Sequence, residues 1–294
     1  MPELPEVHTV ARDLHALISG RRIKDVWCGA PQLLRSGTLL SLRRFLSGAE
    51  VRHVYRKGKH IIFSLDKDRA FAVHLKMTGH FLTGSWILPR KFGVLPQLRP
   101  GFEGEVKEPV NRFIRLVISF KDGTEIGLSD ARKFARVRWG NEQDLLNLPE
   151  FAGLGPDALA EDFTAQEFAA RLTRTRRTIK QALLDQTIVA GFGNIYADDA
   201  LYAAGIHPMH RADQVSEARL KKLFVRGREV LRKAIALRGS SMIAFRHMDG
   251  AKGAYGPERL VYGRTGEPCR RCKEPIVRKK IQGRSTHFCM KCQN

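Results

Sequence analysis

The chain has 294 residues, of which 51 are Lys or Arg and 30 are Asp or Glu, giving a formal charge of +21. This length is enough for two or three domains, each with its own core. So large a basic excess favours a polyanionic partner, most often nucleic acid and less often a membrane surface or a ribosome. No stretch is long and apolar enough to span a bilayer, and no signal peptide precedes the first helix, so we expect a cytosolic protein. Five cysteines in such a protein argue against a disulfide framework.

The chain opens Met1-Pro2-Glu3, and removal of Met1 would expose Pro2 as an N-terminal amine. Such an amine has a pKa of about 7.7–8.0, against about 10.4 for Lys, so roughly a tenth of it is neutral at neutral pH. A neutral amine can attack an aldehyde-level carbon, and a neighbouring carboxylate can move the protons. Pro2 and Glu3 are therefore a candidate Schiff-base nucleophile and its acid/base partner. A disordered terminus in front of a helix is the alternative that two residues leave open.

The first half of the chain predicts one helix followed by strands. Residues 5–19 carry apolar side chains at helical spacing, with Pro5 in the first turn and Gly20 after the end. Residues 22–140 are mostly strand-like, which predicts an α+β fold with an N-terminal antiparallel β-sandwich and flanking helices. Residues 84–111 are rich in Gly and Pro and are expected to form an excursion between strands. The expected strands are 23–28, 50–55, 60–65, 69–75, 113–120, 125–129 and 135–140.

The second half changes to helical periodicity. Pro149, Gly153, Gly155 and Pro156 suggest a linker over residues 141–156. Helical spacing then runs from Thr164 to about Gly239, before a loop rich in Gly and Ser and a small Cys-bearing unit. We therefore predict four segments: an N-terminal domain 1–140, a linker 141–156, a helical domain with a long loop 157–262, and a C-terminal unit 263–294.

Two Cys-x2-Cys pairs with 16 residues between them lie at the C-terminus, namely Cys269, Cys272, Cys289 and Cys292. This spacing is typical of a four-thiolate zinc site, and metal binding would fold so small a unit. Rubredoxin-type iron and two disulfides are the alternatives. Gly283 marks a hairpin turn between the pairs, and Arg284 at its tip is either a phosphate contact or an ordinary solvated arginine. His287 is expected to be structural, because four thiolates already satisfy zinc.

A glycine-containing turn joins two predicted helices of the helical domain. Asn194 is the expected N-cap of the second helix, and Gly191 and Gly193 would let backbone N–H groups approach an anion at its N-terminus. A tight turn without a ligand is equally consistent with this pattern. The basic segment 171–180 just before it, which includes Arg176 and Lys180, favours contacts with a phosphate backbone.

These features together resemble the Fpg/Nei family of DNA glycosylases over nearly the whole chain. Leu4 favours the purine-lesion branch, because the pyrimidine branch typically has Pro-Glu-Gly-Pro-Glu at the start. Lys59 falls on the position of the family's catalytic lysine. Without the resemblance, Lys59 would be interpreted only as a basic residue at the end of a strand. The matching motifs are Pro2–Val7, Lys57–His60, His74–Gly79, Asp130–Phe134, Gly191–Tyr196 and Val261–Arg264.

The resemblance implies a bifunctional glycosylase and abasic-site lyase of base-excision repair, acting on 8-oxoguanine and formamidopyrimidines in double-stranded DNA. It further implies one structural zinc ion, a monomer, and a bacterial, nucleoid-associated location. Pro2 would attack the sugar, Glu3 would move protons, and Lys59, Asn194 and Arg284 would contact phosphates. The implied fillers of the hole left by the flipped base are Met77, Arg132 and Phe134, although Met77 and Phe134 taken alone would more often be core residues.

Several positions depart from the family's pattern. Lys76 stands where the family often has Gly, and Asp199 where many members have Glu. Asn111 begins Asn-Arg-Phe in place of His-Asp-His and is a weaker candidate for a DNA contact. The expected lesion-recognition loop, residues 240–246, lacks the usual Thr-Thr. An oxidised-pyrimidine glycosylase and a catalytically silent zinc protein that binds nucleic acid are the alternative functions.

Overall fold

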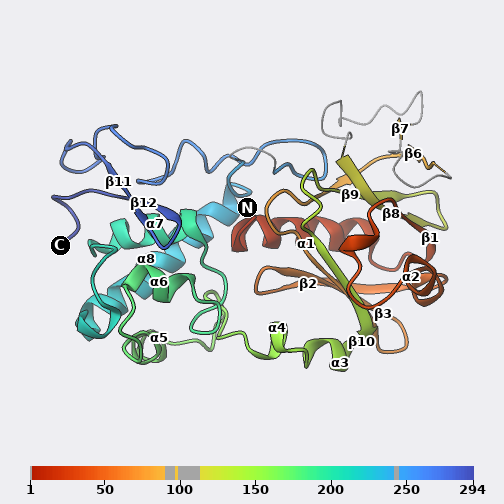
Figure 1. The fold of residues 1–294 in the computed structure, drawn as a ribbon, viewed down its shortest axis with the longest axis horizontal. Helices are drawn as coiled ribbons and strands as arrows, with labels where there is room; N and C mark the ends of the chain where they lie inside the picture. The colour runs from red at the N-terminus through yellow and green to blue at the C-terminus, as the bar shows by residue number, and fades with distance from the viewer. Residues whose placement is uncertain (1, 90–96, 99–112, 242–244) are drawn as a thin grey trace. The chain divides into compact units, whose positions relative to one another are not determined.

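The computed structural model describes residues 2–89, 97–98, 113–241 and 245–294, coloured along the chain in Figure 1. They form two compact units. Unit 1 comprises residues 1–2, 6–152 and 239–253, and unit 2 comprises residues 3–5, 153–238 and 254–294. Most of the Gly- and Pro-rich excursion expected at 84–111 lies outside the described residues, as does Asn111.

Unit 1 contains two four-stranded sheets whose neighbouring strands are antiparallel. The first sheet has the order β1-β8-β9-β5, with bounds Ile23–Cys28, Ile114–Phe120, Glu125–Ser129 and His80–Thr83. The second has the order β10-β4-β3-β2, with bounds Arg136–Asn141, Arg69–His74, His60–Leu65 and Val51–Lys57. Apolar side chains from both sheets and from helix α1 (Leu4–Ile18) share one core, which confirms the predicted α+β sandwich.

The remaining elements of unit 1 were not predicted. Helix α2 (Leu39–Leu46) follows Thr38, which forms a capping box with Ser41. Two short strands, β6 (Trp86–Ile87) and β7 (Gln97–Leu98), pair with each other. A 3-10 turn, η1, spans Pro31–Leu33.

Residues 141–156, expected as a linker, contain helices α3 (Glu142–Leu146) and α4 (Pro149–Ala152). Asn141 caps α3 by accepting hydrogen bonds from the amides of Gln143 and Asp144. Pro149 starts α4 instead of interrupting a helix, because proline is tolerated in a first turn. Leu145 and Phe151 are buried in a cluster with side chains of the second sheet, so residues 141–152 belong to unit 1.

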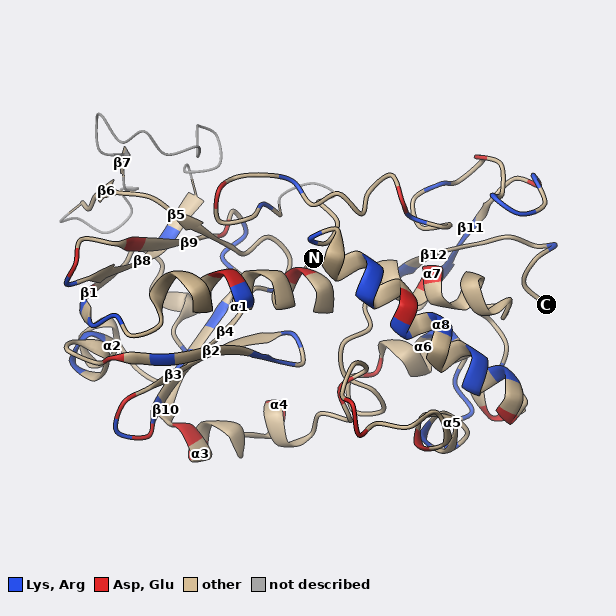
Figure 2. Cartoon of the chain, turned by 180° about the vertical axis from the view of Figure 1, so that it is seen from behind, with Lys and Arg blue, Asp and Glu red and all other residues tan. Residues whose placement is uncertain are grey.

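Unit 2 is built around helix α7 (Asn194–Ala204), most of whose side chains are buried. Helix α7 packs against α8 (Glu217–Ala236) and against strand β12 (Arg284–Phe288), which forms a hairpin with β11 (Val277–Ile281). Lys and Arg residues lie along the outer side of α8 in Figure 2. The other helical elements are α5 (Ala165–Leu172), α6 (Ile179–Leu184) and the 3-10 turn η3 (Ala212–Gln214).

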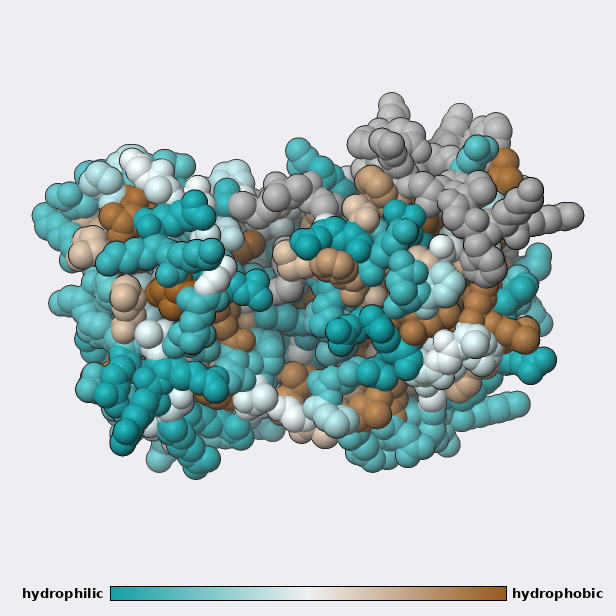
Figure 3. All heavy atoms as spheres, in the orientation of Figure 1, coloured by the Kyte–Doolittle hydropathy of each residue, from teal (hydrophilic) through white to brown (hydrophobic). Residues whose placement is uncertain are grey.

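The visible face in Figure 3 is mainly hydrophilic, with separate apolar patches. Among the helices of the described residues, none is both long and apolar enough to cross a bilayer.

Candidate active site and nucleic-acid interface

The Glu3 carboxylate lies at the amino end of α7. Glu3 is 2% exposed, and its two oxygens accept hydrogen bonds from the amides of Ile195 (3.2 Å) and Tyr196 (3.4 Å). The partial positive charge of a helix N-terminus stabilises an ionised carboxylate placed there. The N-cap residue is Gly193, which has no side chain to cap the helix, so the prediction that Asn194 is the N-cap is wrong. A carboxylate from the start of the chain takes that role.

The two glycines of the turn before α7 make room for the first residues of the chain. A Cβ added at Gly193 would lie 2.1 Å from the carboxyl carbon of Glu3. Gly191 has a φ of +123°, and a Cβ there would lie 2.3 Å from Leu4. The sequence predicted that this turn would bind an anion at the helix N-terminus. In the structure the turn is occupied by Glu3 and Leu4 of the chain itself.

Lys59 lies at the turn between β2 and β3 and is only 9% exposed. The next residue, His60, is opposite His74 in the register of β3 and β4, and the two ring centroids are 4.5 Å apart. Burial lowers the pKa of His60 to about 4 and that of His74 to about 2, and the charges of Lys76 and Lys59 lower the pKa of His74 further. Both imidazoles are therefore neutral at pH 7.

Neither histidine is among the site residues that the sequence predicts, because a single histidine in a strand carries little signal. Pairing the predicted strands 60–65 and 69–75 as a hairpin would have placed them opposite each other. His74 also accepts a hydrogen bond from the amide of Lys76, at 3.0 Å. Lys76 has a φ of +51°, a backbone conformation that favours glycine, at the position where the family often has Gly.

Two exposed loops of unit 1 carry Met77, Arg132 and Phe134. Asp130, which is completely buried, joins these loops: it is hydrogen-bonded to the Thr78 hydroxyl and accepts the amide of Arg132 at 3.2 Å. Met77 is 38% and Phe134 46% exposed, so neither is a core residue. The Arg132 guanidinium lies 4.4 Å from the centre of the Phe134 ring. The loops that carry the three expected fillers are therefore held together by one buried carboxylate.

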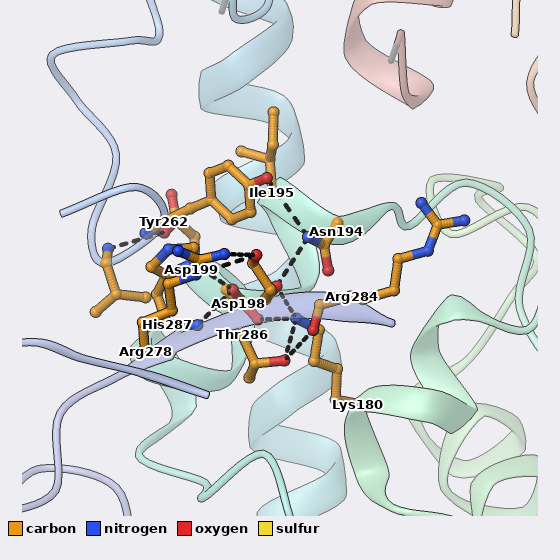
Figure 4. Close-up of polar contacts among 12 residues, drawn as sticks. Lys180, Asn194, Ile195, Asp198, Asp199, Tyr262, Arg278, Arg284, Thr286 and His287 are labelled. Atoms are coloured by element: carbon orange, nitrogen blue, oxygen red, sulfur yellow. Dashed lines mark hydrogen bonds and ion pairs between the residues drawn. The ribbon is translucent and has the colours of Figure 1, made fainter. Parts of the chain in front are cut away.

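The tip of the C-terminal hairpin lies beside the amino end of α7, as Figure 4 shows. Gln282 and Gly283 both have positive φ, which forms the tight two-residue turn between β11 and β12. Arg284 follows this turn with an exposed side chain, and Asn194 donates a hydrogen bond to the carbonyl of Ser285 at 2.9 Å. A cavity of about 240 Å³ lies between α6 and the hairpin, and Arg177 and Arg284 are among its lining residues.

The two basic residues predicted from the segment 171–180 have different surroundings. Arg176 is exposed. Lys180 is 1% exposed, and its ammonium group contacts Asp198, the Ser285 carbonyl and the Thr286 hydroxyl. Its three N–H groups therefore have acceptors inside the protein.

The four predicted cysteines form one cluster, with all sulfur atoms within 4.8 Å of one another. The Cys269–Cys292 sulfur distance is 3.8 Å and the Cys272–Cys289 distance is 3.4 Å. Tetrahedral zinc with bonds of about 2.3 Å places sulfurs about 3.8 Å apart, so the four thiols fit zinc. His287 is not part of this cluster. Its side chain contacts Asp198, in agreement with the structural role expected for it.

Comparison with known proteins assigns the chain to a family. Residues 1–137 match the formamidopyrimidine-DNA glycosylase N-terminal domain, 154–246 the H2TH domain of the same enzymes, and 266–294 the zinc finger found in FPG and IleRS. The chain is 36% identical over 296 residues to the formamidopyrimidine-DNA glycosylase of Desulfitobacterium hafniense, with both chains fully covered. The chain belongs to the formamidopyrimidine-DNA glycosylase family.

Solved structures of this family share the fold. The chain is similar to the Lactococcus lactis Fpg in complex with DNA containing an abasic site, with a TM-score of 0.85, 32% identity and full coverage of both chains. It is also similar to the MutM (Fpg) protein of Thermus thermophilus, with a TM-score of 0.83, 32% identity and coverage of 99% and 98%.

Two departures from the formamidopyrimidine-DNA glycosylase pattern have a clear structural setting. Asp199 is fully buried. Its carboxylate accepts hydrogen bonds from the Tyr255 hydroxyl at 2.8 Å and from the Val261 amide at 2.9 Å, which joins α7 to the segment before the zinc finger. In the expected lesion-recognition loop, the amide of Ser240 donates to the carboxylate of Glu6 at 2.7 Å. Residues 242–244 of that loop lie outside the described residues.

Proposed function

We propose that this chain is a bifunctional DNA glycosylase of base-excision repair. It removes oxidised purines, 8-oxoguanine and formamidopyrimidines, from double-stranded DNA and then cuts the strand at the abasic site. The observation that carries this proposal is the buried Glu3 carboxylate on the amino end of α7, directly after Pro2, in a chain that matches its family from end to end. We further propose that it works as a monomer on the bacterial nucleoid.

Pro2 is the proposed nucleophile once Met1 has been removed. Its amine attacks C1′ of the damaged nucleotide as the base leaves, which gives an iminium adduct. Glu3 moves protons as the sugar ring opens. The iminium acidifies the C2′ proton, so β-elimination breaks the bond to the 3′ phosphate and δ-elimination then breaks the bond to the 5′ phosphate. The product is a gap of one nucleotide.

The remaining site residues divide into phosphate contacts and fillers. Lys59, Asn194, Arg176 and Arg284 are the proposed phosphate contacts, with Lys59 and Arg284 also assisting the chemistry, and the exposure of Arg176 and Arg284 supports this part of the proposal. Flipping a nucleotide costs a few kcal/mol, which groups filling the vacated space help to offset. The exposure of Met77 and Phe134 supports their assignment as fillers together with Arg132.

Zinc would be bound by Cys269, Cys272, Cys289 and Cys292 and would supply only the fold of the C-terminal unit. That fold presents Arg284 on a rigid hairpin. We propose a catalytic segment 1–140, a DNA-binding segment 157–262 and a zinc finger 263–294, and within the predicted linker 141–156 residues 141–152 pack on the second sheet as part of unit 1.

Borohydride trapping tests this function. The wild-type protein, with removal of Met1 checked by intact mass, should form a covalent adduct with duplex DNA containing 8-oxoguanine, and Pro2→Gly should trap far less. No adduct with any oxidised base would refute the enzyme. An adduct only with thymine glycol or dihydrouracil would instead assign the chain to pyrimidine lesions. Full lyase activity in Pro2→Gly would refute the assignment of the nucleophile.

A further inference from the structure

We propose that Lys180 is a positioning residue that holds the backbone beside Arg284, and that it does not contact DNA. This inference rests on the proposed function, because it assigns Arg284 to the phosphate contact and the elimination step. It replaces the expectation that Lys180 is itself a phosphate contact.

The contacts of Lys180 all point into the protein. Its ammonium group lies 2.7 Å from an oxygen of Asp198, 3.0 Å from the Ser285 carbonyl and 2.8 Å from the Thr286 hydroxyl. Ser285 and Thr286 directly follow Arg284 in the sequence, and Figure 4 shows Thr286 beside Lys180. Because the Asp198 charge balances that of Lys180 and the ammonium has no further N–H group to donate, the pair offers no net charge to a phosphate.

Asp198 continues the network to the other end of the hairpin strand. Its second oxygen accepts the amide of His287 at 2.8 Å and contacts the His287 ring at 3.2 Å. Lys180 comes from α6, Asp198 from α7 and His287 from β12. The buried pair therefore fastens the strand that begins with Arg284 to two helices.

The Ser285 carbonyl is the point where this network meets the proposed interface. It accepts hydrogen bonds from both Lys180 and Asn194, at 3.0 and 2.9 Å. The Arg284 side chain itself is exposed, so its position follows from the backbone next to it. Loss of Lys180 removes one of the two donors to that carbonyl and leaves Asp198 with an unbalanced buried charge, which displaces the hairpin tip.

A double-mutant cycle in the full-length, zinc-loaded protein tests the proposal. Lys180→Met, Arg284→Ala and the double variant are compared on duplex DNA with an abasic site, for the ratio of δ- to β-elimination product. Their Kd for a tetrahydrofuran-containing duplex is measured against salt concentration. We expect each single variant to lower the product ratio about fivefold or more, and the double variant to match Arg284→Ala.

A direct phosphate contact by Lys180 predicts a different result. The two losses would then add, and Lys180→Met would reduce the slope of log K against log salt by about 0.9 even in the Arg284→Ala background. That outcome would overturn the inference. Lys222→Met, which removes an exposed lysine of α8 outside the proposed interface, is the control and should leave the product ratio unchanged.

Folding is controlled separately, because Lys180→Met leaves Asp198 unpaired. The double variant Lys180→Met/Asp198→Asn removes both charges and should bind zinc while showing the same low product ratio, and a wild-type ratio in it would contradict the proposal. Lys180→Arg keeps the charge and should recover part of the ratio. If the wild-type protein fails to cut abasic DNA, the proposed function is refuted. The Kd values of the single and double variants then decide by themselves whether Lys180 contacts DNA.

Discussion

The Glu3 carboxylate lies against Gly193 so closely that a Cβ at that glycine would be 2.1 Å from the carboxyl carbon. The same carboxylate accepts hydrogen bonds from the amides of Ile195 and Tyr196 in the first turn of α7, and these bonds fix the position of Glu3. Glu3 is covalently next to Pro2, so the position of the proposed acid/base group relative to the proposed nucleophile depends on a glycine far along the chain.

Gly193→Ala should therefore disable the enzyme. The added methyl group displaces Glu3 from the helix, and we expect excision of 8-oxoguanine and cleavage of abasic DNA both to fall by about 100-fold or more, which corresponds to about 2.7 kcal/mol of transition-state stabilisation. Single-turnover rates measure this. The control is Gly256→Ala, where an added Cβ meets nothing within 4 Å and the rates should stay within about twofold of wild type. Wild-type rates in Gly193→Ala would show that Glu3 does not act from this position.

Met77→Ala and Phe134→Ala should separate base removal from strand cutting. Both side chains are exposed, so the melting temperature should change little. Excision of 8-oxoguanine should fall about tenfold or more, because the space left by the flipped base is no longer filled, whereas cutting at an existing abasic site should fall less. Met209→Ala, at 44% exposure in unit 2, is the matched control. Equal losses in both assays would argue against the filler assignment.

Zinc removal should weaken DNA binding without unfolding the helices of unit 2. The core of α5 to α8 contains none of the four cysteines, whereas the C-terminal unit has only a small cluster around Cys269 and Cys289. Cys272→Ser should lose zinc and bind a tetrahydrofuran-containing duplex about tenfold more weakly, since the Arg284 hairpin is no longer ordered. Cys28→Ala, which removes a buried thiol of unit 1, should retain zinc and affinity. Metal analysis and Kd are the measurements, and full affinity in the zinc-free protein would contradict this role.

The half-buried pair His60 and His74 should make unfolding sensitive to acid. Unfolded imidazoles bind protons below about pH 6.5, whereas burial lowers the folded pKa of His60 to about 4 and that of His74 to about 2. Between these values the unfolded state binds more protons, so the free energy of unfolding falls as the pH falls from 6.5, and above pH 6.5 the pair contributes no pH dependence. Each imidazole contributes a slope of about 1.4 kcal/mol per pH unit.

His60→Phe tests this dependence. The phenyl ring can occupy the site, where Phe151 already lies 4.5 Å from the imidazole centroid, so the variant should still fold. Urea unfolding between pH 4 and 6.5 should show a slope lower by about 1.4 kcal/mol per pH unit. An unaltered slope in His60→Phe would mean that this imidazole titrates as freely in the folded state as in the unfolded state.

Local patterns predicted the elements that local physics determines. The strands 23–28, 60–65 and 125–129 have the predicted bounds, because their apolar runs end at turn residues. The hairpin turn at Gly283 was predicted because tight turns need residues that tolerate positive φ. The helices α2 and α3 were missed because their caps, Thr38 and Asn141, begin segments of only eight and five residues, too short for a clear helical period.

The sequence by itself predicted the four zinc ligands, the proposed nucleophile with its neighbouring acid, and the excess of basic residues that favours a polyanionic partner, because each of these depends on residue type and on spacing over a few positions. Only the tertiary structure decided that Glu3 caps a helix 192 positions away, that Asp130 joins the two filler loops, and that Asp198 neutralises Lys180. Whether a charged residue faces solvent or a buried partner depends on which distant segments pack together, and that information is not contained in any local pattern.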